Sequence, residues 1–231
     1  MDRKKDIIRI LEHMSGRYSM YEVFSDWIRC GALAISNACQ YFHDRVWQER
    51  EQEYINTMKK YKPEEQNRFV EMLCLLTETL ENEMEDVLGQ IYMDAGMGSR
   101  SAGQFFTPWH LSLLCADVAM PDPDENGCYR INEPSCGGGG MIIAAACAIR
   151  NRGLNYQKCM KVVAQDLDWK GVYMCYLQLS LLGIRAVVVQ GDTLREPYEQ
   201  RYPRSRTMYT PGERGLLIWW NFLKEVQRGG K

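Results

Sequence analysis

The chain has 231 residues, of which 45% are hydrophobic and 25% are charged, and its formal net charge is −2. These values describe an ordinary globular protein with one large domain or two small ones. No apolar run is long enough to span a bilayer, and the charged start MDRKKDIIRI lacks the apolar core of a signal peptide, so we expect a cytoplasmic protein with no membrane partner.

Charge is distributed unevenly along the chain. Residues 1–100 carry 13 basic and 18 acidic side chains, whereas residues 101–231 carry 15 basic and 12 acidic ones. The excess of basic side chains in residues 101–231 would favour binding of a polyanion such as DNA. Because the excess is small, an ordinary solvated charged surface explains it equally well.

Cysteine and histidine do not indicate a metal site. The nine cysteines are an odd number, lie mostly within apolar helical patterns and form no Cys-x-x-Cys. The three histidines, His13, His43 and His110, are far apart. We therefore expect free, buried thiols, no disulfide framework and no metal.

Apolar residues recur at helical spacing throughout residues 1–96, and we expect an all-α N-terminal domain there. Helices are predicted over residues 6–14, 21–42 and 63–91, the last opened by Lys62-Pro63-Glu64-Glu65. We interpret the acids of this last helix as its solvated face, rather than as paired carboxylates: Glu78, Glu81, Glu83, Glu85 and Asp86.

A polar, glycine-containing segment at residues 96–101 marks the boundary to a second domain, residues 97–231. Strands and helices then alternate: helix 109–118, strand 128–132, helix 139–150, strand 161–165, helix 169–182 and strand 185–190. This order predicts an α/β fold with a parallel sheet and right-handed crossovers.

The stretch NEPSCGGGGM, residues 132–141, lies between the first strand and its helix. Ligands of such sheets bind beyond the carboxyl ends of the strands, and glycines there let a ligand approach the backbone. A dinucleotide fingerprint needs a third small residue, but Ile142 or Ile143 stands at that position, which disfavours NAD. We therefore predict that the turn binds S-adenosylmethionine.

Acids at the strand ends support this cofactor. Glu133, before the turn, suits the ammonium group of S-adenosylmethionine. Asp166 ends the second strand and suits the two ribose hydroxyls, while Asp192 follows the third strand and suits the adenine amino group. A chance surface placement of all three acids is the less favoured interpretation.

Four motifs in order resemble the adenine-N6 DNA methyltransferases that serve as modification subunits of type I restriction–modification systems. They are GQFFTP (103–108), EPSCGGGGM (133–141), AQDLDWKGVYMCYLQLSLLGI (164–184) and GDTL (191–194). Residues 1–95 are similar, with lower specificity, to the helical N-terminal lobe of those subunits. Glu133 replaces the usual aspartate of the family, and Gly138 its usual serine.

The resemblance implies a Rossmann-like, S-adenosylmethionine-dependent methyltransferase domain that acts on adenine in DNA. It also implies a cofactor site in which GQFFTP flanks the methyl donor, the turn holds the amino acid part, and later acids hold ribose and adenine. The residues are Gln104, Phe105, Phe106, Thr107 and Pro108, then Glu133, Pro134, Ser135, Cys136, Gly137 and Gly139, and finally Asp166, Leu167, Asp192 and Thr193.

One part of the family pattern is missing. Family members carry Asn-Pro-Pro-aromatic at the end of a fourth strand. There, two oxygens accept the hydrogens of the adenine amino group and the ring stacks on the flipped-out base. No Asn-Pro-Pro, Asp-Pro-Pro or Ser-Pro-Pro occurs in this chain, so its catalytic residues stay unassigned. We expect three strands, or four at most, and hence a partial sheet.

Three functions stay open at this point. The chain is a shortened DNA adenine-N6 methyltransferase completed by a partner subunit, a catalytically inactive binding or regulatory module, or a methyltransferase for another substrate. Strand 128–132 would be an unpaired edge, which proteins usually cover. We expect the helical part, the Trp219-Trp220 segment, or a second chain (a copy of this one or a partner subunit) to cover it.

Overall fold

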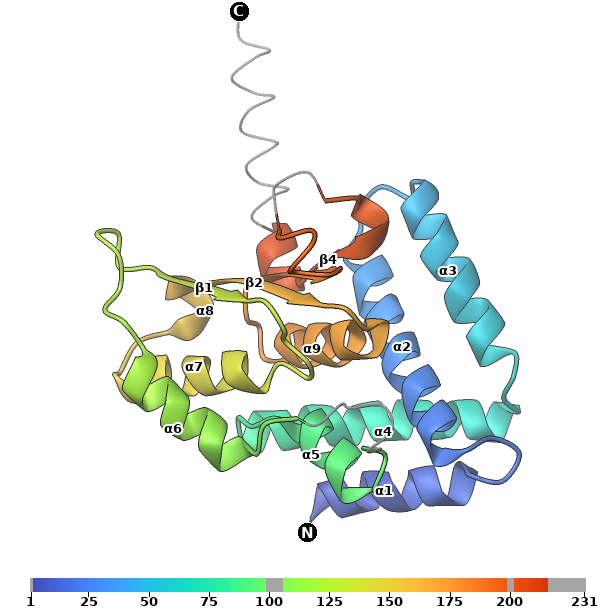
Figure 1. Cartoon of the computed structure of the whole chain (residues 1–231). Helices are drawn as coiled ribbons and strands as arrows, with labels where there is room; N and C mark the ends of the chain where they lie inside the picture. The colour runs from blue at the N-terminus through green and yellow to red at the C-terminus, as the bar shows by residue number, and fades with distance from the viewer. Residues whose placement is uncertain (1, 99–105, 199–201, 216–231) are drawn as a thin grey trace, which may run out of the picture.

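The computed structural model describes residues 2–98, 106–198 and 202–215. A four-stranded sheet lies against two helices, and the helices of the N-terminal part pack against these in turn (Figure 1). Across these residues, none of the helices has both the length and the apolar character needed to cross a bilayer.

Helices alone form the first part of the chain: α1 (Arg3–Met14), α2 (Met20–Ala38), α3 (Arg45–Met58), α4 (Pro63–Asn82) and α5 (Val87–Asp94). Polar side chains define their starts. Ser19 and Glu22 form a capping box on α2, and Asp44 accepts from Trp47 N at the start of α3. These caps satisfy amide groups that have no partner within the helix.

The helix predicted to run to Phe42 ends earlier, at Ala38. The side-chain amide of Gln40 donates to Phe42 O and to Asp44 Oδ1, both at 2.9 Å, and holds the chain in a turn before α3. Tyr41 and Phe42 are exposed on this turn.

The helix predicted over residues 63–91 is broken into α4 and α5. Glu83 is extended, and Asp86 caps α5 by accepting from Gly89 N at 2.9 Å. Glu85 and Asp86 are consequently buried, at 8% and 4% exposure. The interpretation of these two acids as part of a solvated face was wrong, because the break turns them inward.

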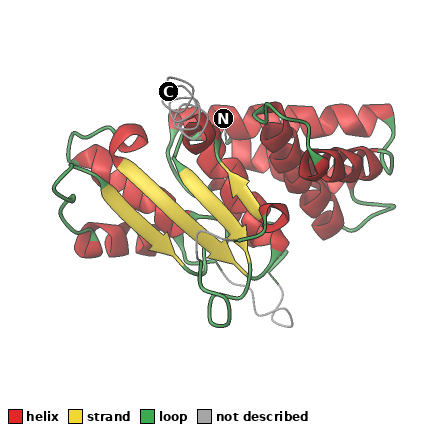
Figure 2. Ribbon diagram, turned by 90° about the horizontal axis from the view of Figure 1, so that it is seen from above, coloured by secondary structure: helices red, strands yellow, loops and turns green. Residues whose placement is uncertain are grey.

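The sheet has the order β1-β2-β3-β4 (Figure 2). Its strands are β1 (Tyr129–Glu133), β2 (Met160–Asp166), β3 (Ala186–Gln190) and β4 (Thr207–Tyr209). The first three are parallel, and β4 is antiparallel to β3. This arrangement confirms the predicted α/β class with a partial, mostly parallel sheet.

The remaining helices connect these strands. They are α6 (Trp109–Ala119) before β1, α7 (Gly140–Asn151) and the short α8 (Tyr156–Cys159) between β1 and β2, and α9 (Trp169–Leu181) between β2 and β3. The short helix α8 was not predicted. The α9 helix packs on β2 and β3, while α7 packs on β1 and α6.

The larger of two hydrophobic clusters in the described residues runs through both parts of the chain. It joins Trp27 of α2 and Leu88 of α5 to Val162 of β2 and Tyr176 of α9. The α2 helix packs along α9, so the helical part rests on the same helix that supports the sheet. The division at residue 96 stays a prediction, and the packing continues across it.

The outer edge of β1 pairs with no strand within the described residues. The N-terminal helices pack on α9, whereas β1 packs against β2 and α7. The expectation that the helical part covers this edge was therefore wrong. The Trp219-Trp220 segment lies outside the described residues, and cover by a second chain stays a prediction.

Candidate functional site

The glycine turn connects β1 to α7 and is bonded to the neighbouring strand. Cys136 N donates to Gln165 O at 2.9 Å, and Gly139 N donates to Cys136 O at 2.7 Å. Gly137 and Gly139 have φ values of +49° and +93°, which residues with a side chain rarely adopt. Two of the four glycines are therefore required by the shape of the turn.

Protein groups press closely on the same turn. A Cβ atom on Gly137 would lie 2.9 Å from the Phe106 ring, and one on Gly140 would lie 2.9 Å from Asp86 Oδ2. Larger residues at these positions would displace the ring or the carboxyl group. The glycines thus let two distant segments, one before α5 and one before α6, approach the turn.

A cavity of about 230 Å³ lies where these segments meet. Six of the predicted site residues line it: Phe106, Thr107, Ser135, Cys136, Gly137 and Asp166. The Phe106 ring is held by an edge contact with the buried Tyr92, at 5.2 Å between ring centroids. The structure therefore brings three of the four sequence motifs together.

Asp166 stands at the carboxyl end of β2. Its Oδ2 accepts from Gly137 N at 2.8 Å, and its Oδ1 accepts from Asp168 N at 2.9 Å. Each carboxylate oxygen has a second lone pair, so these bonds leave capacity for a ligand hydroxyl.

Other predicted residues lie beside the cavity rather than on its lining. The Glu133 carboxyl accepts from Ser135 N at 3.2 Å, and burial together with the charge of Asp166 raises its pKa. Leu167 is exposed, and its carbonyl accepts from Gln190 Nε2 at 2.8 Å. Pro108 is the N-cap residue of α6. Gln104 and Phe105 lie outside the described residues.

The turn after β3 contacts the turn after β1. Thr193 Oγ1 donates to Pro134 O at 2.6 Å. Asp192 Oδ1 accepts from Leu194 N at 3.0 Å, and its Oδ2 lies 3.5 Å from Arg195 Nε. Asp192 and Thr193 thus stabilise the loops at the carboxyl ends of the strands, outside the lining of this cavity.

Sequence reasoning missed several residues at the site, and three of them are polar. Asp86 and Ser112 line the cavity, and Gln178 of α9 binds the turn by donating to Gly138 O at 2.7 Å. The signal for Asp86 was its residue type, because aspartate is preferred at the N-cap of a helix, where its side chain accepts from an amide two or three residues later. Nothing in the sequence pattern distinguishes Ser112 or Gln178 from ordinary helix residues.

The cavity residues do not form a nucleophile or metal site. The neighbouring Cys175 thiol and burial both raise the pKa of the Cys136 thiol, which disfavours the reactive thiolate. Within the described ranges, no group of three or more His, Cys, Asp or Glu residues could hold a metal ion.

The residues present do fit S-adenosylmethionine. The Ser112 hydroxyl is buried and has no hydrogen-bond partner in the described part of the chain, which points to a polar ligand. The glycine turn exposes backbone rather than side chains, Asp166 offers acceptor capacity, and Phe106 supplies an apolar wall.

A comparison with protein families finds one that matches residues 83–210, and its description is N-6 DNA Methylase. A comparison with curated proteins finds no match. The matched range begins just after α4, so it includes Asp86, and it ends directly after β4. It therefore covers the sheet, the cavity and the last helix of the N-terminal part.

Proposed function

The chain belongs to the N-6 DNA methylase family, and from this membership we propose that it binds S-adenosylmethionine and takes part in methylating the N6 amino group of adenine in DNA. One observation carries the proposal: Phe106, the glycine turn and Asp166 line one cavity at the carboxyl ends of β1 and β2. The order of the four motifs favours a relationship to the modification subunits of type I systems.

The residues of this chain bind and orient the cofactor in the proposal. Asp166 accepts from the ribose hydroxyls, and Phe106 forms the apolar wall next to the glycine turn. Asp192 and Thr193 keep the loop after β3 next to the turn, on the side where adenine binds. When bound, S-adenosylmethionine supplies the methyl group from its sulfonium.

We propose further that a partner subunit supplies the part that holds the target base. The Asn-Pro-Pro-aromatic motif does not occur among these 231 residues. A partner strand can pair with the outer edge of β1, which pairs with no other strand in the part of the chain that the structure describes. The α6 helix, which packs on α7, exposes Leu111, Leu114 and Val118 at the spacing of one helix face. Figure 1 places β1 and α6 on the side opposite α2 and α3.

Calorimetric titration of the purified chain with S-adenosylmethionine tests cofactor binding. We expect binding by the wild-type chain and its loss or marked weakening in Asp166→Ala. A well-folded chain that does not bind would contradict the proposal.

Transfer of labelled methyl groups from S-adenosylmethionine to adenine-containing DNA tests the partner. The probe is a fragment taken from a complete family member. The fragment begins after the cofactor-binding half of that protein and carries its Asn-Pro-Pro-aromatic motif. We expect transfer only when the fragment is present, and none when its motif Asn is replaced by Ala. Transfer by the chain alone would contradict the need for a partner.

A second candidate function is a regulatory module that binds S-adenosylmethionine without catalysis. The absence of Asn-Pro-Pro-aromatic is the observation that favours it. Tight cofactor binding without transfer in the presence of the fragment would support this module over the enzyme.

A further inference from the structure

Asp86 reaches the cavity from the helical part of the chain, far in sequence from the glycine turn. Its side chain is buried, yet it lines the cavity. Oδ1 accepts from Gly89 N at 2.9 Å and from Gln178 Nε2 at 2.8 Å. Oδ2 has no hydrogen-bond donor within the described residues, so one oxygen of a buried carboxyl group is left for a ligand.

Gln178 holds this carboxyl group in place against the turn. Its Nε2 bonds both Asp86 Oδ1 and Gly138 O, and its Oε1 accepts from Leu88 N at 3.0 Å. Asp86 Oδ2 would lie 2.9 Å from a Cβ on Gly140, the first residue of α7. The free oxygen therefore faces the start of α7 with no side chain between them.

Ser112 supplies a second unpartnered group at the same cavity. It lies on α6, its side chain is 0% exposed, and its Oγ has no partner in the described part of the chain. Buried polar groups in native proteins are nearly always paired. An orphaned hydroxyl beside a cavity is therefore a group that a bound ligand would satisfy.

The Asp86 carboxyl, the Ser112 hydroxyl and the first amides of α7 indicate which part of a ligand they could bind. A carboxylate oxygen needs a donor and favours a cation. The hydroxyl of Ser112 and the first amides of α7, whose N-cap residue Gly139 provides no side-chain cap, can donate to an anion. An acceptor for a cation and donors for an anion in one small cavity match the α-ammonium and α-carboxylate groups of an amino acid.

We propose that Asp86 binds the α-ammonium group of the methionine end of S-adenosylmethionine, and that Ser112 and the first amides of α7 bind its α-carboxylate. The assignment rests on the proposed function, because it is the cofactor that carries this amino acid end. It moves the ammonium group from Glu133, which accepts from Ser135 N beside the cavity, to a residue of the helical part. The helical part then belongs to the cofactor site.

Calorimetric titrations with two ligands test the role of Asp86. The ligands are S-adenosylmethionine and its analogue in which a hydroxyl replaces the α-amino group. Wild type is expected to bind the analogue about tenfold to a hundredfold more weakly, the effect of one charge-assisted hydrogen bond. Asp86→Asn should bind S-adenosylmethionine as weakly as the analogue and lose the discrimination. Its side-chain oxygen can still accept from Gly89 N, and thermal unfolding checks that the variant is folded.

Two matched variants distinguish binding of the ammonium group by Asp86 from binding by Glu133. Glu133→Gln removes the competing carboxylate, and Asp122→Asn repeats the substitution at an exposed position outside the cavity. Both should keep the preference for the amino group. Equal binding of the two ligands by wild type, or lost discrimination in Glu133→Gln with retained discrimination in Asp86→Asn, would overturn the assignment. A folded wild-type chain that binds neither ligand would instead contradict the proposed function.

Ser112→Ala tests the second part of the proposal, that Ser112 binds the α-carboxylate of the cofactor. This test does not depend on the folding of the Asp86 variant. The probe is decarboxylated S-adenosylmethionine. Wild type should bind it more weakly than S-adenosylmethionine, and Ser112→Ala should reduce that difference while keeping the preference for the amino group. An unchanged difference in Ser112→Ala would overturn the role of Ser112.

Discussion

The backbone N–H of Gly137 donates to Asp166 Oδ2 at 2.8 Å. This hydrogen bond joins the first glycine of the turn after β1 to the acid at the end of β2. The residue proposed to bind ribose therefore also stabilises the turn that forms the rest of the site. Substitutions of Asp166 should affect both ligand affinity and the stability of the turn, and the two effects can be separated.

Asp166→Ala should weaken S-adenosylmethionine binding by about tenfold to a hundredfold, because it removes a charged acceptor from the ribose hydroxyls. Asp166→Asn keeps one oxygen that can accept from Gly137 N, so it should lose affinity with a smaller loss of stability. Calorimetry measures the affinity and urea unfolding the stability. Asp122→Ala is the exposed control, and an unchanged affinity in Asp166→Ala would contradict the role of the acid.

Gly137→Ala should destabilise the chain by about 1–3 kcal/mol, because alanine is strained at a positive φ and its Cβ would lie 2.9 Å from the Phe106 ring. Gly153→Ala is the matched control, since Gly153 also has a positive φ of +77° but no atom within 4 Å of the added Cβ. Urea unfolding of the two variants should show the larger loss for Gly137→Ala. Equal losses would mean that the contact with Phe106 is not restrictive.

Asp86 should make stability depend on pH. Burial raises the pKa of its carboxyl group, with a contribution from the charge of Glu85, against the lowering effect of hydrogen bonds from Gln178 and Gly89. Because the pKa in the folded state is above the unfolded value of about 4, this contribution to stability is complete below pH about 4 and is lost as the pH rises through the folded pKa.

Asp86→Asn cannot titrate, so it provides the reference for this effect. The difference in free energy of unfolding between wild type and Asp86→Asn should fall as the pH rises from about 4. Urea unfolding of both proteins at a series of pH values measures it. Parallel pH profiles would show that Asp86 keeps an ordinary pKa in the folded chain.

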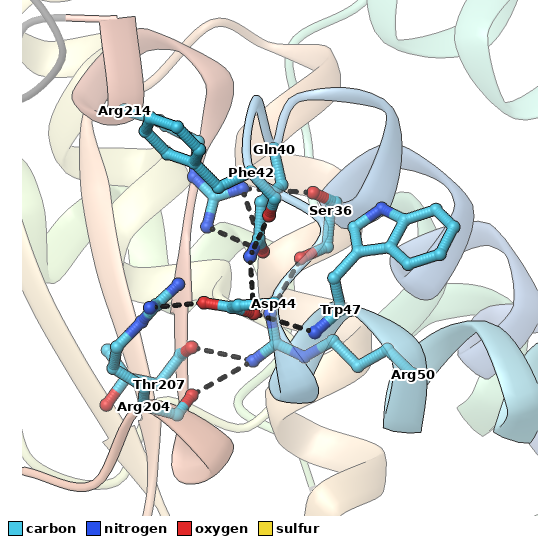
Figure 3. A network of polar contacts seen from close by, with 9 residues as sticks. All are labelled: Ser36, Gln40, Phe42, Asp44, Trp47, Arg50, Arg204, Thr207 and Arg214. Carbon is cyan, nitrogen blue, oxygen red and sulfur yellow. Dashed lines mark hydrogen bonds and ion pairs between the residues drawn. The ribbon is translucent and has the colours of Figure 1, made fainter.

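Arginines hold β4 to the helical part of the chain (Figure 3). The buried Arg50 of α3 donates from Nη2 to Thr207 O at 2.8 Å and to Arg204 O at 3.2 Å, and from Nη1 to Ser36 Oγ at 3.0 Å. Arg214 donates to Ser36 O at 3.2 Å, and Arg204 pairs with Asp44. The chain after β3 is thereby fastened to α2 and α3.

Arg50→Ala should lower the free energy of unfolding by about 2–3 kcal/mol, because three hydrogen bonds from a charged donor are lost and the Thr207 carbonyl loses its buried donor. Arg50→Lys should rescue little, since an ammonium group does not reproduce the planar fork of guanidinium. Arg45→Ala, on the same helix, removes an exposed pair with Glu49 and should leave the unfolding midpoint nearly unchanged. Similar midpoints for the Arg45 and Arg50 variants would contradict a structural role for Arg50.

Local patterns determined much of this protein. Apart from the short helix α8, the strands and helices between residues 109 and 190 were predicted to within two residues at each end, because their apolar periodicity and glycine or proline boundaries act over a few residues. The same patterns indicated the parallel sheet and the glycine turn, and the family match supports the methylase family. The cofactor-binding roles of individual residues stay predictions.

Tertiary structure decided what local patterns do not contain. The break between α4 and α5 depends on the bonds of Asp86 to Gly89 and to Gln178, the latter 92 residues away in sequence. The Ser112 hydroxyl, which has no hydrogen-bond partner among the described residues, indicates a ligand site only because the fold places it beside the cavity. Whether a strand pairs with the outer edge of β1 depends on the strand order of the sheet. Helix and strand periodicity reports which face of an element is apolar. Burial of a polar group and the partner it meets are set by segments far away in the chain, so only the folded structure shows them.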